Sequence, residues 1–443
     1  MKIRVIPETN SSSSHALVFS PFFTHNVMNG IELITYFINF MGELYDEKAS
    51  KEFKDYLLKD PRIQEELKKH PEFRIVEDVY IGIDSYSIPT IWNYTPKDEK
   101  DLIFRLYKEV IIEGIKNNWG VELIRESQHS NTNIPWLAAL VGGGRIEIYR
   151  NGNYTTYILW RSTHERVIYS KIKILDEGET EYITTIPESI DLKITNKCYA
   201  MCPFCHENST PDGEHASYDD VQHLTKALMK HPVPEIAIGG GNPLLHPDLE
   251  KIINNLRPTS SVAITARDID YIEYGAPHGV IGYGISLTTP TNLAKLFELD
   301  IIQEYPVIHV INGVHKTEEV AKALRIYIER GPERFVPAVL ILGFKTFGRG
   351  VTWKVRNTID VKALMKKYPN VVYAFDDLAV KQLNIKNIVP KREWELFYNG
   401  EDGKRTMYID LVKKQYARNS YSKERYNIEE WNIRKMFEKV KKS

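Results

Sequence analysis

All three cysteines of this 443-residue chain lie within eight residues, Cys198-Tyr199-Ala200-Met201-Cys202-Pro203-Phe204-Cys205. Their spacing is C-x3-C-x2-C. Cysteine thiolates are the usual protein ligands of iron–sulfur clusters, and three thiolates on one short loop can bind three irons of a four-iron cluster. The fourth iron then has no protein ligand and is open to a small molecule. The sequence therefore predicts a [4Fe-4S] cluster with one open iron on this loop.

The same loop resembles the signature of the radical S-adenosylmethionine (SAM) superfamily, which also has an aromatic residue directly before the last cysteine. The resemblance implies that Cys198, Cys202 and Cys205 bind the cluster and that the open iron binds the amino and carboxylate groups of SAM. It also implies that Phe204 packs beside the adenine. The tyrosine-rich composition and the short polar N-terminus resemble radical SAM proteins of phage and mobile-element genomes.

A second segment, Gly239-Gly240-Gly241-Asn242-Pro243, resembles the GGEP segment of this family. In the family, this segment presents backbone groups to the amino group of SAM. Asn242 stands where the family usually has Glu. An amide oxygen can still accept a hydrogen bond from an ammonium group, although it lacks the charge that strengthens a carboxylate contact. The resemblance therefore implies a weaker contact at Asn242.

From Ser189 onward, strand and helix patterns alternate, which is typical of parallel βαβ units. Strands are predicted over 190–195, 235–238, 261–265, 280–287, 307–311 and 336–342, and helices over 218–230, 247–256, 291–299 and 317–330. This order resembles the partial (βα)6 TIM-type barrel of radical SAM enzymes. Ligands bind at the C-terminal ends of parallel strands, and the resemblance implies SAM contacts there for Ser286, Asn312 and, less closely matched, Thr265.

The regions on either side of the predicted barrel are expected to form two further parts of an α/β protein. Residues 1–185 are expected to form an α+β domain, with helices over 30–73 and 101–117, a hairpin around Asn151-Gly152-Asn153, and strands over 167–175 and 180–186. Residues 186–385 form the predicted barrel. Residues 386–443 are expected to add a strand over 405–412 and a basic helix over 428–440, which either docks on the barrel or contacts nucleic acid through its basic and aromatic side chains.

Several polar residues near the predicted strand ends have two interpretations each. His206 and Glu207 either support the cysteine loop or act in catalysis. Lys345 and Arg349 lie in a glycine-rich segment, 343–350, and either bind an anionic part of SAM or substrate or belong to a solvated turn. Asp376 and Asp377 either orient the substrate or cap a helix.

Composition excludes some classes of function. The formal net charge is −1, so the molecule as a whole is not expected to bind polyanions. No stretch approaches the ~20 apolar residues of a membrane span, and no apolar run at the N-terminus has the length of a signal peptide. The three clustered cysteines leave no disulfide framework, which fits a reducing compartment. We therefore expect a cytoplasmic protein with no membrane partner.

Because one cluster uses every cysteine, a second all-cysteine cluster and a free catalytic cysteine are excluded. The resemblance then implies that an electron from a flavodoxin or ferredoxin-type reductant cleaves SAM to a 5′-deoxyadenosyl radical, which abstracts a hydrogen from the substrate. A small metabolite and a macromolecule both remain open as substrate, and the long region before the barrel slightly favours a peptide or nucleic acid. The alternatives are a non-catalytic iron–sulfur sensor and a zinc-binding module that uses the three cysteines and His206.

Overall fold

The computed structural model describes residues 3–7, 16–19, 27–28, 59, 61–69, 121–122, 145–162, 167–175 and 181–442, the last range without 334, 356, 392–393, 395–397 and 399. The helices expected over 30–73 and 101–117 lie outside these ranges, except for α3 (Pro61–Lys69). Contacts divide the chain into two compact units. The first consists of Met1–Pro7, Phe22–Ile148 and Tyr154–Tyr182, and the second of Glu8–Pro21, Tyr149–Asn153 and Ile183–Ser443. The domain limits expected at residues 185 and 385 stay predictions.

The first unit contains an antiparallel sheet in the order β1-β7-β6-β5. Its strands are β1 (Ile3–Pro7), β5 (Arg145–Asn151), β6 (Tyr154–Ser162) and β7 (Val167–Leu175). A second, two-stranded sheet pairs β3 (Val27–Met28) with β4 (Val121–Glu122). The predicted hairpin is confirmed, and Gly152 in its turn has φ +56°, a conformation that glycine adopts without strain.

The strand expected over 180–186 is wrong for the described residues 181–186, which are irregular. Their backbone donors are bound by side chains of the hairpin turn instead of by a neighbouring strand. Asn153 Oδ1 accepts from Ile183 N at 2.8 Å, and Asn151 Oδ1 accepts from Thr185 N at 2.7 Å. Asparagine side chains compete in this way with sheet hydrogen bonds.

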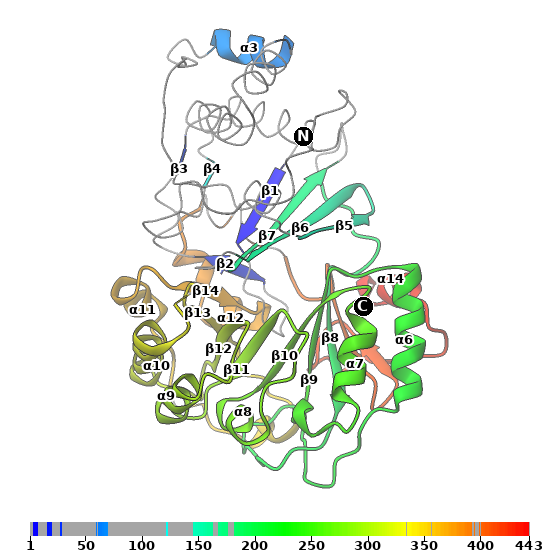
Figure 1. Ribbon diagram of the computed structural model, residues 1–443, viewed down its shortest axis with the longest axis vertical. Coiled ribbons are helices and arrows are strands. Elements are labelled where there is room, and N and C mark those ends of the chain that lie inside the picture. The colour runs from blue at the N-terminus through cyan, green and yellow to red at the C-terminus, as the bar shows by residue number, and fades with distance from the viewer. Residues whose placement is uncertain are drawn as a thin grey trace. The chain divides into compact units, whose positions relative to one another are not determined.

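The second unit is built on one large sheet, shown in Figure 1, with the order β17-β16-β15-β8-β9-β10-β11-β12-β13-β14-β2. Its strands are β2 (Leu17–Phe19), β8 (Ser189–Thr195), β9 (Glu235–Gly240), β10 (Ser261–Arg267), β11 (Gly282–Ser286), β12 (Tyr305–Ile311), β13 (Ala338–Leu342), β14 (Val372–Phe375), β15 (Thr406–Asp410), β16 (Gln415–Ala417) and β17 (Tyr426–Asn427). The predicted parallel α/β domain is confirmed. The sheet is not closed in the described residues, because β14 pairs antiparallel with β2 and β15 pairs antiparallel with β16.

The parallel run is longer than the sequence predicts. The strand expected over 405–412 pairs in parallel with β8, and β14 pairs in parallel with β13. The run therefore begins at β15, continues through β8 and ends at β14. Since parallel strands share one direction, their C-terminal ends meet at one edge of the sheet.

Helices α6 to α11 lie around the outer side of the curved sheet (Figure 1). The helices of this unit are α6 (Tyr218–Lys230), α7 (Leu249–Leu256), α8 (Asp268–Tyr274), α9 (Pro290–Glu298), α10 (Thr317–Arg330), α11 (Val361–Lys367), α12 (Asp377–Gln382) and α14 (Ile433–Lys441), with short 3-10 turns at η2 (Pro243–Leu245), η3 (Gly348–Thr352) and η4 (Ile385–Asn387). No helix in the described part of the chain is both long and apolar enough to span a bilayer.

Capping and apolar spacing explain where these helices form. In α6, Ser217 Oγ accepts a hydrogen bond from Asp220 N at 3.2 Å, and Val221, Leu224 and Leu228 form a buried face. In α14, Asn432 caps the first turn, and its buried face consists of Ile433, Met436, Phe437 and Val440. The C-terminal helix therefore docks on the core, as one of the two interpretations expected.

The core of the second unit lies between the sheet and these helices. Leu192, Ile194, Ile238 and Ile264 on the strands are 0–1% exposed and belong to the same cluster as the helix residue Leu224. Each such side chain contributes about 1.5–3 kcal/mol when it is buried. This packing holds the strands rigidly and so fixes the positions of the residues at their ends.

Candidate active site

A cavity of about 590 Å³ lies at the C-terminal ends of the parallel strands. Every strand from β8 to β13 contributes a wall residue, and so does β15. These residues are Lys193, Gly239, Thr265, Arg267, Ser286, His309, Ile311, Leu342 and Tyr408, among others. The cavity is the place where a parallel sheet presents ligand contacts.

The cysteine loop directly follows β8, and Cys198, Cys202 and Cys205 all line the cavity. Two backbone hydrogen bonds shape the loop, from Cys198 N to Thr210 O at 2.8 Å and from Cys205 N to Cys202 O at 3.2 Å. Met201 has φ +49°, an uncommon conformation for a residue other than glycine. The structure thus brings the three predicted cluster ligands together on one wall.

The loop after β13 holds the cysteine loop in place. Arg349 Nε donates to Cys202 O at 2.9 Å, and Arg349 N donates to Cys205 O at 3.0 Å. Gly348 has φ +54°, and a Cβ on it would lie 2.5 Å from His206 O, so only glycine fits there. The Arg349 guanidinium therefore binds the protein's own loop, whereas Lys345 of the same segment lines the cavity.

The glycine segment after β9 has two roles. Gly240 has φ +118°, and a Cβ on Gly241 would lie 2.3 Å from Lys197 O. Both glycines therefore allow the end of β9 to approach the start of the cysteine loop, where Gly241 N donates to Thr195 O at 2.8 Å. A Cβ on Gly239 would meet no atom within 4 Å, so this backbone is open to the cavity.

Three predicted SAM contacts do not line the cavity, namely Asn242, Pro243 and Asn312. Asn242 is buried, and its Oδ1 accepts from Leu244 N at 3.1 Å, which caps the turn that begins at Pro243. Asn312 Oδ1 accepts from Ile359 N at 3.1 Å, and its Nδ2 donates to Gln382. Asn242 Oδ1 and both polar atoms of the Asn312 amide are thus used within the protein, which sequence patterns do not reveal.

Phe204, Ser286 and Thr265 do line the cavity. Phe204 packs edge to face on Trp353, with the ring centroids 5.5 Å apart. Thr265 Oγ1 is buried and has no hydrogen-bond partner among the described residues. Because buried hydroxyl groups almost always have a partner, this atom indicates that the cavity is built for a polar ligand.

A positive charge near the cysteines opposes the effect of burial on the pKa of their thiols. Burial raises the pKa of the Cys198 and Cys202 thiols, and the positive charge of Arg267 opposes this shift. Arg267 Nε also donates to Asp270 Oδ2 at 2.8 Å. Iron binds the deprotonated thiolate, so Arg267 favours the form of Cys198 and Cys202 that binds iron.

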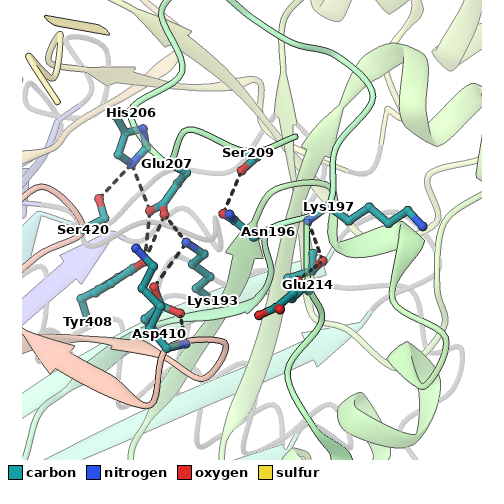
Figure 2. A network of polar contacts seen from close by, with 12 residues as sticks. Lys193, Asn196, Lys197, His206, Glu207, Ser209, Glu214, Tyr408, Asp410 and Ser420 are labelled. Carbon is teal, nitrogen blue, oxygen red and sulfur yellow. Dashed lines mark hydrogen bonds and ion pairs between the residues drawn. The ribbon is translucent and has the colours of Figure 1, made fainter. Parts of the chain in front are cut away.

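Figure 2 shows a buried network of charges beside the cysteine loop. Lys193 Nζ lies 2.7 Å from Glu207 and 3.3 Å from Asp410, and the Tyr408 hydroxyl donates to Glu207 at 3.1 Å. The Lys193 and Glu207 side chains are 2% and 9% exposed. Burial alone would raise the pKa of Glu207, but the hydrogen bond from His206 and the charge of Lys193 hold it well below its usual range.

His206 and Glu207 both contact polar side chains of this network. His206 Nε2 lies 3.0 Å from Ser420 Oγ (Figure 2), and both residues line the cavity. Sequence reasoning missed Lys193, Tyr408 and Ser420. The one available signal was Lys193 itself, because a lysine in the apolar strand Ile190–Thr195 is buried only when it has a partner. The pair Asp376 and Asp377 lies elsewhere, and Asp376 caps α12 through Ala379 N at 2.7 Å.

These residues fit a four-iron cluster. Among the described residues, no three His, Cys, Asp or Glu side chains converge as ligands of one metal ion. In a four-iron cluster each thiolate would bind a different iron, so the three sulfur atoms need not point at one centre. The open backbone at Gly239 and the unpartnered Thr265 hydroxyl fit a polar ligand beside the cluster.

Comparisons with known proteins agree with this arrangement. Residues 192–358 match the family model of the Radical SAM superfamily. The chain is similar to a probable GTP 3′,8-cyclase of Archaeoglobus fulgidus (30% identity over 136 residues, 30% of this chain and 45% of the relative) and to one of Methanococcus maripaludis (38% over 71 residues, 16% and 24%). It is also similar to Streptococcus suis SuiB bound to the precursor peptide SuiA, with 14% identity, a TM-score of 0.44, and coverage of 59% of this chain and 68% of that one.

The chain spans less than half the length of these curated relatives. The family uses a [4Fe-4S] cluster and SAM, and the matched segment contains the three cysteines, the glycine segment and Ser286. Residues 192–358 of this chain therefore match the radical SAM superfamily.

Proposed function

We propose that this protein reductively cleaves SAM at a [4Fe-4S] cluster, with an electron from a flavodoxin or ferredoxin-type reductant, and uses the 5′-deoxyadenosyl radical to remove hydrogen from a substrate C–H bond. The observation that carries the proposal is the shared cavity: the three cysteines of one loop, the open backbone of Gly239 and the Ser286 side chain line it together. We further propose that the protein acts in the cytoplasm.

The chain's own residues would position the reaction and exclude water. Cys198, Cys202 and Cys205 would bind the cluster, and Arg349 would keep their loop in one conformation. The backbone of Gly239 and the hydroxyls of Ser286 and Thr265 offer polar contacts to SAM, with Phe204 beside the adenine. Asn242, Pro243 and Asn312 would hold the loops that carry these contacts.

The substrate class follows less directly from these observations. A macromolecule such as a peptide or a nucleic acid is proposed, because a long region precedes the barrel domain. The curated relatives named above are described as acting on GTP, and the SuiB structure holds a peptide. Both classes therefore belong in a substrate screen.

The test is anaerobic. The protein is reconstituted with iron and sulfide, reduced with dithionite and given SAM, and 5′-deoxyadenosine is quantified. The wild type should release the nucleoside and Cys202→Ala should not. Tyr199→Phe is the matched control, because Tyr199 lies on the same loop but is 56% exposed, and it should retain the activity.

Two outcomes would contradict the proposal. A complete cluster whose EPR spectrum does not change with SAM, without nucleoside, would favour an iron–sulfur sensor. Stoichiometric zinc in place of iron would favour the zinc-binding module. If the nucleoside forms, deuterium transferred to it from labelled peptides, nucleic acids or metabolites would identify the substrate.

A further inference from the structure

Among the described residues, three Lys and Arg side chains line the cavity, and they differ in their partners. These residues are Lys193, Arg267 and Lys345. Lys193 is paired with Glu207 and Asp410, and Arg267 is paired with Asp270. Lys345 has no carboxylate within 4 Å among the described residues. It is therefore the cation in this wall that has charge available for a ligand.

The backbone on both sides of Lys345 is fixed, so its side chain has a defined direction. Phe344 N donates to Gln382 Oε1 at 2.9 Å, and Gly343 N donates to Asp376 Oδ1 at 2.8 Å. A Cβ on Gly350 would lie 2.4 Å from Lys345 O, which shows how tightly the loop folds back. Lys345 Nζ then donates to Ser420 Oγ at 3.2 Å and lies 5.4 Å from the centre of the Tyr421 ring.

Two carboxyl groups feel the charge of Lys345 but do not line the cavity. Burial raises the pKa of Asp376 and of Asp402, and Lys345 partly opposes this. Asp376 Oδ1 is occupied by two backbone amides, of Gly343 and Ala379, and Asp402 Oδ2 accepts from the Tyr421 hydroxyl at 3.0 Å. Neither carboxyl group therefore takes the place of a ligand on the cavity side of Lys345.

Ser420 completes a small polar corner. Its carbonyl oxygen accepts from Arg425, which fixes the backbone, and its hydroxyl lies between Lys345 Nζ and His206 Nε2. An ammonium group beside a hydroxyl is a donor set for the oxygens of a carboxylate or a phosphate, and hydrogen bonds that combine opposite charges are the strong ones. Tyr408 and Lys193 also line the cavity, and both belong to the network of Figure 2.

We propose that Lys345 and Ser420 bind an anionic group of the substrate, a carboxylate or a phosphate, in the cavity that also contains the cysteines. The proposal rests on the proposed function, since it assigns a substrate class to that site. It goes beyond it because it requires the substrate to carry a negative charge at a fixed place relative to the cluster.

The test uses simple anions, first without SAM and then with SAM added to the reconstituted protein. Inorganic phosphate and acetate are titrated separately into the full-length protein at constant ionic strength, and binding is followed by calorimetry. The wild type should bind at least one of them saturably, and the anion that binds more tightly indicates the class, phosphate or carboxylate. Lys345→Met should weaken the binding about tenfold or more, and Ser420→Ala should weaken it less.

The matched control is Lys354→Met, which removes the same charge. Lys354 is exposed and lies on the segment that follows Lys345. It should bind the anion as the wild type does. Lys345→Arg, which keeps the charge, should restore most of the affinity. Circular dichroism and thermal melting of each variant separate a folding defect from a loss of binding.

Three results would overturn the proposal: no saturable binding of either anion, equal losses in Lys345→Met and Lys354→Met, or displacement of the anion by SAM in the reconstituted protein. Displacement would assign Lys345 to the carboxylate of SAM. If neither anion binds at this subsite but 5′-deoxyadenosine still forms, only the substrate inference is refuted. Absence of the nucleoside refutes the proposed function.

Discussion

Arg349 donates a hydrogen bond from its guanidinium Nε to the carbonyl oxygen of Cys202 at 2.9 Å. The two residues are far apart in the sequence, and the loop that follows β13 supplies the group that holds the cysteine loop. The Arg349 guanidinium also donates to Asn208 Oδ1 at 3.3 Å. One side chain therefore ties both ends of the loop that carries Cys202 and Cys205.

Replacement of Arg349 should loosen the bound cluster. In Arg349→Met, the carbonyl of Cys202 loses a donor with a positive charge, and we expect iron release to a chelator to be about tenfold faster. Lys354→Met is the control for loss of a positive charge nearby. The measurement is the anaerobic decay of the cluster absorbance after a chelator is added. Equal decay in the two variants would contradict the role of Arg349.

The adjacent glycines should respond differently to one added methyl group. In Gly241→Ala the Cβ would meet Lys197 O at 2.3 Å, whereas in Gly239→Ala it would meet nothing within 4 Å. We expect Gly241→Ala to lower the free energy of unfolding by about 1–3 kcal/mol and Gly239→Ala to leave it nearly unchanged. Urea unfolding of the metal-free protein measures both. A similar cost for the two variants would mean that the close approach of β9 to the cysteine loop is absent.

Two ion pairs of the same length should differ in their contribution to stability because they differ in burial. Lys193 lies 2.7 Å from Glu207 with its side chain 2% exposed, and Lys251 lies 2.7 Å from Asp248 with its side chain 67% exposed. Lys193→Met leaves Glu207 and Asp410 as buried charges without a cation, which costs about 3–5 kcal/mol. Lys251→Met should leave stability nearly unchanged, because water screens the exposed pair.

Urea unfolding of both lysine variants measures this difference. The double variant Lys193→Met with Glu207→Gln should recover part of the loss, because one unpaired buried charge has been removed. If the single and double variants are equally stable, the charge of Glu207 is not compensated by Lys193 in the folded state.

Stability should fall as the pH rises towards neutrality, because of Asp402. Burial and the charges of Asp376 and Asp377 raise the pKa of Asp402 to about 7, whereas in the unfolded chain it is about 3.9. Between these values the unfolded chain has released its proton and the folded protein has not. The folded state is therefore favoured at low pH, and this contribution, at most about 4 kcal/mol, is lost as the pH rises through the folded pKa.

Asp402→Asn removes this titration and should flatten the pH dependence. Thermal melting of the metal-free protein between pH 5 and pH 8 should show a smaller change in the midpoint than in the wild type. Asp212→Asn is the control, because Asp212 is exposed, and it should follow the wild type. A variant at Asp402 with the wild-type pH profile would show that this carboxyl group does not titrate in that range.

Much of the site could be predicted from local patterns. The cysteine spacing located the loop, and alternation of strands and helices located the cavity edge, because both signals are short in sequence. Local patterns failed where side chains replace regular hydrogen bonds. Residues 181–186 have a strand-like composition, but Asn151 and Asn153 bind their backbone donors. Asn312 has a position typical of a ligand contact, but its amide binds Ile359 and Gln382.

The chemistry of the ligands follows from the sequence alone, since three thiols within eight residues can meet on one loop whatever the rest of the chain does. So does the parallel α/β architecture, because apolar periodicity and capping act over a few residues. Only the tertiary structure decided which charges face the cavity. The charged and polar residues of the cavity come from separate strands and loops, among them Lys193, Glu207, Lys345 and Ser420. Which of them pair depends on the order of the strands in the sheet. That order therefore decides which cation is available for a ligand and which cations are already bound.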